Sequence, residues 1–171
     1  MSVAPVTAFV ALGANLGNPA AQLAAALSEL AALPQTRLIK HSSLYRSAPV
    51  GADYRGQPDF INAVAQIETA LAPHALLDAL LALERAHGRT RESRNAPRTL
   101  DLDLLLYGDL RQHEPGLTLP HPDLHERAFV LVPLAEIAAG AKVPGHGRVA
   151  ELLNNIDAGG VVKLDPETVA R

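Results

Sequence analysis

Between Leu100 and Leu104 the chain alternates leucine with aspartate, and this alternation constrains the fold more than any other feature. Residues two positions apart in a β-strand point to the same face, so Asp101 and Asp103 would lie side by side, roughly 6 to 7 Å apart. The leucines would then face a core. We therefore predict a strand over residues 99–107 whose polar face carries two adjacent like charges, an arrangement that is unfavourable unless cations neutralise it.

The other apolar segments predict an alternation of strands and helices. Strands are expected over residues 7–12, 37–46 and 60–68. Asn18 is a suitable N-cap before Pro19, with leucines at helical spacing as far as Pro34. A second helix is expected from Pro73 to about His87. The order βαββαβ predicts an α+β fold, a ferredoxin-like sandwich with an antiparallel sheet, both helices on one face and C-terminal additions.

Length and composition indicate a single domain over residues 1–171. A chain of 171 residues with 48% hydrophobic content can build one core of ordinary proportions. The absence of cysteine excludes disulfides, thiolate metal sites and thiolate nucleophiles. No secretory leader and no run of about 18 apolar residues is recognisable. We expect a cytoplasmic protein, monomeric by default and without a membrane partner.

Arginines are concentrated just before the two aspartates. The net charge is -3, yet five of the twelve arginines fall within residues 85–98: Arg85, Arg89, Arg91, Arg94 and Arg98. Guanidinium groups match phosphate oxygens, whereas paired carboxylates suit Mg²⁺. The combination predicts a site for a nucleoside triphosphate with metal. No serine, cysteine or histidine stands in a recognisable nucleophile setting, which favours direct transfer.

The run APRTLDLDLLLYGD, residues 96–109, resembles the signature of the 6-hydroxymethyl-7,8-dihydropterin pyrophosphokinase family of the folate pathway. Five further segments agree in the same order along nearly the whole chain. They are FVALGANLGNP, SSLYRSAPVG, QPDFINAVAQIET, LERAHGRTR and LTLPHPDLHERAFVLVPLAEIA. A long motif supported by collinear segments is far more specific than a lone glycine-rich loop.

This resemblance implies a ferredoxin-like fold, two Mg²⁺ ions, and attack of the pterin hydroxymethyl oxygen on the β-phosphorus of ATP, with AMP leaving. Asp101 and Asp103 match the metal-binding aspartates. Together with Arg89 and Arg98, which match arginines on the nucleotide phosphates, they form the implied catalytic set. Further positions match the ATP site of the family: Glu84, Leu104, Thr118, His121 and Arg127.

On the pterin side the resemblance implies an aromatic pair and a ring-edge contact. Phe60 and Phe129 match the aromatic pair that sandwiches the ring, and Asn62 matches the asparagine that hydrogen-bonds it. The segment that completes the pocket is matched by Ser47, Ala48, Pro49 and Val50. By themselves, the two phenylalanines would more often be ordinary core residues, and an Asp-x-Asp strand more often a solvated face.

The chain departs from the best-known members at several positions. Asn95 stands where some relatives place a tryptophan, in a loop that is one residue shorter here. Pro122 replaces an aromatic residue, and Leu81 stands where some relatives have a glutamine. We expect loop closure and secondary ATP contacts to differ, while the reaction type is kept.

Other classes of function compete with this prediction. His121, Asp123 and His125 could offer two imidazoles and a carboxylate to zinc, as in a hydrolase. A βαββαβ sandwich with clustered arginines is also how some RNA-binding modules are built, but the chain has only three phenylalanines and three tyrosines, and we expect no nucleic-acid partner. A non-catalytic nucleotide-binding module is the remaining alternative.

Overall fold

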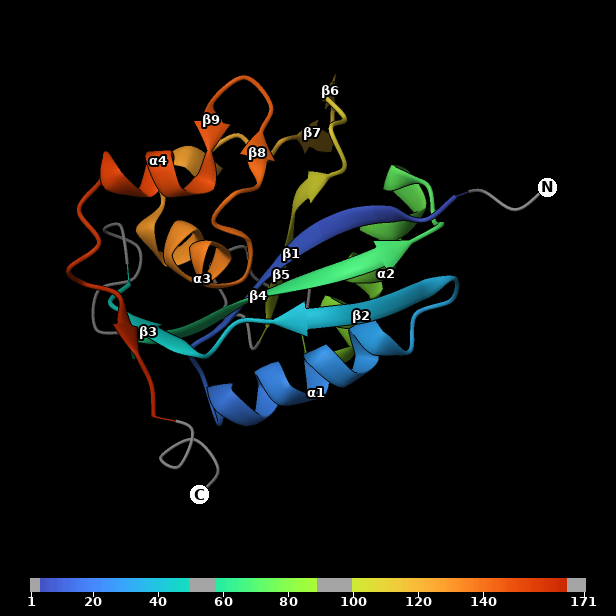
Figure 1. Cartoon of the computed structure of the whole chain (residues 1–171). Coiled ribbons are helices and arrows are strands. Elements are labelled where there is room, and N and C mark those ends of the chain that lie inside the picture. Colours follow the sequence, from blue (N-terminus) through green and yellow to red (C-terminus); the bar gives the residue numbers. More distant parts are fainter. Residues whose placement is uncertain (1–3, 50–57, 89–99, 166–171) are drawn as a thin grey trace.

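The computed structural model describes residues 4–49, 58–88 and 100–165. A six-stranded antiparallel sheet forms its centre, with strand order β10-β3-β4-β1-β5 and β2 also paired with β4 (Figure 1). The strands of this sheet are β1 (Val6–Ala14), β2 (Thr36–His41), β3 (Tyr45–Ser47), β4 (Phe60–Thr69), β5 (Asp101–Tyr107) and β10 (Val162–Lys163).

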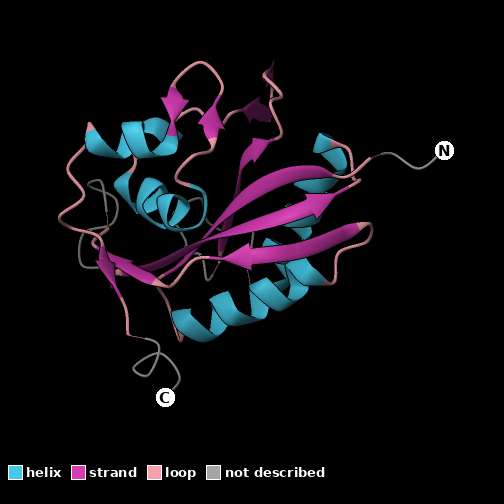
Figure 2. Ribbon diagram, viewed as in Figure 1, coloured by secondary structure: helices cyan, strands magenta, loops and turns pink. Residues whose placement is uncertain are grey.

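Helices cover both faces of the sheet, as Figure 2 shows. One face carries α1 (Pro19–Ala31) and α2 (Pro73–Ala86), and the other carries α3 (Ala128–Ala138) and α4 (Val149–Asn154) (Figure 1). A 3₁₀ turn (Leu124–Glu126) precedes α3. Two small hairpins complete the described elements: β6 (Gln112–Glu114) with β7 (Leu117–Leu119), and β8 (Lys142–Val143) with β9 (Gly147–Arg148).

Each face of the sheet has its own apolar core. Leu23 and Leu30 of α1 and Leu80 of α2 pack against one face, with alternate residues of β1 and β5 beneath them. Leu131 and Leu134 of α3 pack against the opposite face. Burial of these side chains stabilises the sheet from both sides. Among the described helices, none is both long enough and apolar enough to cross a membrane.

The two predicted helices are confirmed, because their signals are local. The Asn18 side chain accepts a hydrogen bond from the Ala21 backbone N–H at 3.2 Å, and Pro19 opens α1. Pro73 opens α2, whose buried face carries Leu76 and Leu80. A cap residue, a proline at the first position and an apolar stripe are sufficient to define such a helix.

Two predicted strand boundaries are wrong. The first strand, expected to stop before Gly13, continues to Ala14, because Gly13 still pairs with Asn62 of β4 and Asp101 of β5. The second, expected as one strand over residues 37–46, is divided into β2 and β3. At the break, the Ser42 backbone N–H still donates to the Val64 carbonyl at 2.8 Å, but the Val64 N–H donates to the Ser42 hydroxyl at 2.9 Å.

A β-bulge changes the alternation along β5. Phe9 pairs with Leu106, whereas Val10 pairs with Leu104, so that Leu105 is an extra residue. Leu104 therefore belongs to the core under α1 and α2, while both Leu105 and Leu106 belong to the core under α3. A bulge shifts which side chains face each layer beyond it. Asp101 and Asp103 precede the bulge, where the predicted alternation with the buried Leu102 and Leu104 is present.

Helix α3 is tied to the chain around β3 through Glu136. Its carboxylate accepts hydrogen bonds from the Ser43 backbone N–H at 3.0 Å, the Ser43 hydroxyl at 3.0 Å and the Tyr45 hydroxyl at 2.5 Å. Burial acts to raise the pKa of Glu136, but these hydrogen bonds and the charge of Lys163 outweigh it and hold the pKa below its usual value. Burial, followed by the hydrogen bond to Glu136, raises the pKa of the Tyr45 hydroxyl.

The substitution Glu136→Gln replaces charge-assisted hydrogen bonds with neutral ones, and it is expected to lower the free energy of unfolding by about 1 kcal/mol at pH 7. The loss is small because the carboxylate is exposed and solvent weakens its interactions. A carboxyl with a depressed folded pKa stabilises the protein above its unfolded pKa, and this stabilisation is lost as pH falls through the folded value. Urea unfolding of both proteins at pH 7 and near pH 3 tests this. The two curves should converge in acid; a difference that stays constant with pH would contradict it.

Candidate active site

A cavity of about 550 Å³ opens on the α3 side of the sheet and collects most of the residues that the sequence singled out. Asp101 and Asp103 line it from β5. Other predicted residues line it from β3, β4 and the start of α3: Ser47, Ala48, Pro49, Phe60, Asn62, Arg127 and Phe129. The carboxylates of Asp101 and Asp103 therefore share one recess with an amide and two aromatic rings that come from distant parts of the sequence, and Glu126 and Asp157 line it as well.

The sheet register explains how the carboxylate end and the amide end come to face the same space. Gly13 of β1 lies directly between its partners Asp101 of β5 and Asn62 of β4. Directly opposed residues of antiparallel strands point to the same face. Gly13 has no side chain to fill the gap, and a Cβ added there would lie 3.5 Å from the Asn62 Oδ1. This glycine keeps the floor of the cavity low.

Gly13 and Ala11 line the cavity but were not among the predicted site residues. Ala11 pairs with Asp103, one step along β1 from Gly13. Their common signal is the recurrence of small side chains at alternate positions of a buried strand, which leaves space above one face of the sheet. That signal becomes interpretable only once the neighbouring strands are known.

The Asn62 amide is held by a buried hydrogen bond. Its Nδ2 donates to the Ser47 Oγ at 2.8 Å, and both side chains are buried. Phe60 and Asn62 are two positions apart on β4, and Ser47 pairs with Phe60, so the aromatic ring and the amide belong to the same face of the sheet. A buried, hydrogen-bonded amide keeps a defined orientation, which is what recognition of a ring edge requires.

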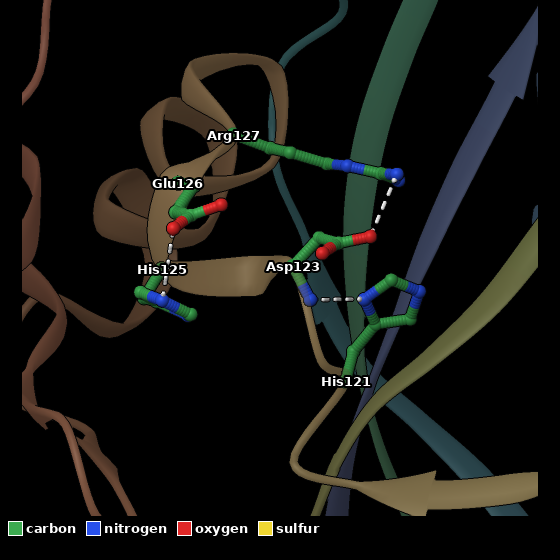
Figure 3. Close-up of polar contacts among 5 residues, drawn as sticks. All are labelled: His121, Asp123, His125, Glu126 and Arg127. Atoms are coloured by element: carbon green, nitrogen blue, oxygen red, sulfur yellow. Dashed lines mark hydrogen bonds and ion pairs between the residues drawn. The ribbon is translucent and has the colours of Figure 1, made fainter.

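Arg127 stands where the 3₁₀ turn meets α3, with His121 and Asp123 beside it (Figure 3). Its Nη2 donates to the Asp123 Oδ2 at 3.1 Å, and its guanidinium carbon lies 5.6 Å from the centroid of the Phe129 ring. The second contact is within the range of a cation-π interaction. Arg127 thus presents a fixed positive charge next to an aromatic wall of the cavity.

His121 lies close to the aspartates without lining the cavity. Its Nδ1 accepts a hydrogen bond from the Asp123 backbone N–H at 3.2 Å, and its own backbone N–H donates to the Leu105 carbonyl at 2.9 Å. Burial lowers the pKa of the His121 imidazole, the charges of Asp103 and Asp123 oppose the change, and Arg127 supports it. Neutral imidazole is therefore favoured near neutral pH.

Three other predicted ATP-site residues lie outside the lining of the cavity. The buried Glu84 carboxylate accepts a hydrogen bond from the Leu102 backbone N–H at 2.9 Å, between the two aspartates. Leu104 is buried in the core under α1 and α2, and Thr118 lies half-buried on β7. Two positions differ from the best-known members of the family. Leu81 is half-buried on α2, and Pro122 is exposed just before the 3₁₀ turn. The remaining predicted residues lie outside the described residues: Val50, Arg89, Arg98, Arg91, Arg94 and Asn95.

The competing zinc site is not assembled. His125 points away from His121 (Figure 3) and stacks on the His146 ring, with centroids 4.0 Å apart. Over residues 4–49, 58–88 and 100–165, no group of three or more histidine, aspartate or glutamate side chains is arranged to hold a metal ion. The geometry contradicts the hypothesis of a hydrolase built on these histidines and Asp123.

Residues 9–139 match the family model described as 7,8-dihydro-6-hydroxymethylpterin-pyrophosphokinase. The chain is also 46% identical over 161 residues to the 2-amino-4-hydroxy-6-hydroxymethyldihydropteridine pyrophosphokinase of Haemophilus influenzae, which covers 94% of this chain and 99% of the relative. The enzyme of the same name from Pseudomonas aeruginosa is 47% identical over 157 residues, covering 91% of this chain and 95% of the relative.

The fold resembles that of solved structures with little sequence similarity. The crystal structure of Plasmodium falciparum HPPK-DHPS wild type with pteroate superposes with a TM-score of 0.70 at 14% identity. The match covers 88% of this chain but only 44% of that one. The family model spans most of the chain and the relatives match nearly end to end, so the chain belongs to the 7,8-dihydro-6-hydroxymethylpterin-pyrophosphokinase family.

Proposed function

We propose that the chain transfers pyrophosphate from ATP to 6-hydroxymethyl-7,8-dihydropterin, giving the pterin diphosphate and AMP, as a step of folate biosynthesis. The observation that carries the proposal is the cavity in which Asp101 and Asp103 meet Asn62 and Phe129. A carboxylate pair at one part of a recess and an amide with aromatic rings at another suit a reaction between a polyphosphate and a flat heterocycle.

The acceptor would lie on the β3 and β4 side of the cavity. Phe60 and Phe129 would contact the two faces of the ring, and the Asn62 amide would hydrogen-bond its edge. Ser47, Ala48, Pro49 and Val50 would complete the pocket. The hydrogen bond from Asn62 to Ser47 supports this role, because it orients the amide before the ring arrives.

Asp101 and Asp103 would hold two Mg²⁺ ions that accompany ATP. Their carboxylates provide the hard oxygen donors that Mg²⁺ prefers, and they line the cavity from one face of β5. When bound, Mg²⁺ neutralises charge on the phosphate oxygens. The nucleotide would be bound by Glu84, Arg89, Arg98, Leu104, Thr118, His121 and Arg127, with Arg89 and Arg98 acting on its phosphates.

The side chains would promote the reaction by position and charge. Binding of the ring would fix the hydroxymethyl oxygen in line with the β-phosphorus, and the cationic Arg127 beside the cavity would favour the charge that develops on the phosphates. We assign no covalent enzyme intermediate, in keeping with direct phosphoryl-type transfer. Departures at Asn95, Pro122 and Leu81 would alter loop closure and ATP contacts rather than the chemistry.

We extend the proposal to the organisation of the chain. Strand order β3-β4-β1-β5, with α1 following β1 and α2 following β4, supports a ferredoxin-like core with C-terminal additions. We also propose that residues 1–171 form a single domain and that the protein is a cytoplasmic monomer with no nucleic-acid or membrane partner. Gel filtration with light scattering would test the monomer.

The direct test is product analysis. Purified protein is incubated with ATP, Mg²⁺ and the pterin, with each component omitted in turn, and nucleotides are separated by chromatography. AMP should form only in the complete mixture. Formation of ADP, or AMP without the pterin, would reject the proposal. Salt-sensitive retention of RNA with no nucleotide turnover would favour the alternative of an RNA-binding or non-catalytic nucleotide-binding module.

The substitution Phe129→Ala is expected to raise KM for the pterin about 10-fold to 100-fold, since stacking of one aromatic base on a side chain is worth about 1–3 kcal/mol. KM for ATP should change far less. Steady-state kinetics with each substrate varied in turn measures both values. Equal increases in the two KM values would show that Phe129 does not act on the acceptor.

A further inference from the structure

Part of the cavity wall comes from a segment to which neither the sequence nor the family motifs assign a role. Asp157, Gly160 and Val161 line the cavity, yet they follow α4 and lie beyond the residues 9–139 that match the family model. They stand about a hundred residues from Asn62 in the chain. The fold brings them to the cavity wall through the elements before and after them.

Contacts at both ends hold this segment in place. Before it, Ile156 packs against the core under α3. After it, Val162 pairs with Arg46 and Lys163 with Tyr45, and the Leu164 backbone N–H donates to the Leu44 carbonyl at 2.9 Å. Because β10 runs antiparallel to β3, the residues that precede Val162 lie beside those that follow Arg46. Those are Ser47 and Ala48, at the proposed acceptor end.

The segment is itself a closed turn. The Asp157 Oδ1 accepts a hydrogen bond from the Gly159 backbone N–H at 2.9 Å, and the Val161 N–H donates to the Ala158 carbonyl at 3.1 Å. A turn of this kind is stabilised when an aspartate side chain accepts a hydrogen bond from the backbone N–H two residues later. The turn is therefore a built part of the wall rather than a loose end of the chain.

The turn gives the cavity the exposed Asp157 at one end, and a glycine followed by an apolar side chain at the other. Val161 is half-buried, and Gly160 has no side chain. A Cβ added to Gly160 would meet no atom within 4 Å, and its backbone does not have a positive φ. Open space beside a glycine in a cavity wall leaves room for a flat ligand to approach the backbone closely.

We propose that the turn Asp157–Val161 forms a wall of the acceptor end of the cavity, where it limits which ring-shaped acceptors enter; this rests on the proposed function. Gly160 and Val161 are specificity-determining residues in this account. The ligand class is a flat bicyclic heterocycle of the size of a pterin. Through the pairing of β10 with β3, the turn also fixes the width of the recess opposite Ser47 and Ala48.

The test fills the open space. Gly160→Phe is expected to weaken binding of 6-hydroxymethylpterin at least about tenfold, because an overfilled pocket rejects a ligand strongly, with little change for an ATP analogue. Gly140→Phe is the matched control: a Cβ there also meets nothing within 4 Å, φ is not positive, and Gly140 does not line the cavity. The control should bind the pterin as the wild type does.

Binding is measured by pterin fluorescence, independently of turnover, with thermal unfolding of each variant. Unchanged pterin affinity in folded Gly160→Phe would overturn the inference, as would an equal loss in Gly140→Phe. If Gly160→Phe does not fold, Val161→Asn decides: its pterin affinity should fall about fivefold because a polar amide replaces an apolar side chain of the wall, and unchanged affinity overturns the inference. Wild-type protein that binds no pterin would instead reject the proposed function.

Discussion

Replacing Asp103 with alanine, or Asp101 with alanine, is expected to lower kcat by about 10³-fold or more while the protein stays folded. Both carboxylates line the cavity from one face of β5. Without them the metal ions that would stabilise the negative charge of the transition state are no longer held, and the barrier to phosphoryl transfer rises. The measurement is the initial rate of AMP formation at saturating ATP and pterin, over a range of Mg²⁺ concentrations.

Asp109→Ala is a suitable control for these variants. Asp109 follows the same strand, is exposed, and does not line the cavity. Its substitution changes the net charge equally but should leave kcat within about twofold of the wild type, because exposed charges are screened by solvent. Near-wild-type rates in both Asp101→Ala and Asp103→Ala would remove these residues from the proposed chemistry.

The second large effect is expected at Glu84. This residue is 3% exposed, and its carboxylate accepts the Leu102 backbone N–H at 2.9 Å. Glu84→Ala would leave that buried donor unsatisfied and lower the free energy of unfolding by about 2–3 kcal/mol. Leu102 separates the two aspartates, so the same change should shift their positions and reduce kcat.

Glu84→Gln separates the hydrogen bond from the charge. A glutamine keeps an oxygen acceptor and nearly the same volume, so urea unfolding should show a smaller loss than in Glu84→Ala. If both variants lose equal stability, the charge of Glu84 matters more than its bond to Leu102. If neither loses stability, the bond does not hold α2 against β5.

Features with local causes were predictable from the sequence. Asn18 and Pro19 define the start of α1 whatever surrounds it, and the alternation at Asp101 and Asp103 places two carboxylates on one face of any strand. Long-range pairing was not predictable. The bulge at Leu105 and the extension of β1 through Gly13 depend on partners that lie many residues away.

The site divides in the same way. The carboxylate pair follows from residue spacing, whereas Phe60, Asn62 and Phe129 were expected from the family resemblance and meet only because β4 and α3 border the same cavity. Gly13 and Gly160 have no side chain, so their residue type did not identify them as residues of the site. The sheet register places Gly13 between residues of the cavity, and the pairing of β10 with β3 brings the turn that contains Gly160 to its wall.

The most direct measurement follows the terminal phosphates of ATP. The protein is incubated with ATP labelled at the γ-phosphorus, Mg²⁺ and 6-hydroxymethyl-7,8-dihydropterin, and the pterin product is isolated. Transfer of an intact pyrophosphoryl group predicts a labelled pterin diphosphate in amounts equal to the AMP formed, with little free phosphate. A labelled pterin monophosphate with ADP, or label found only in free phosphate or pyrophosphate, would contradict the central claim.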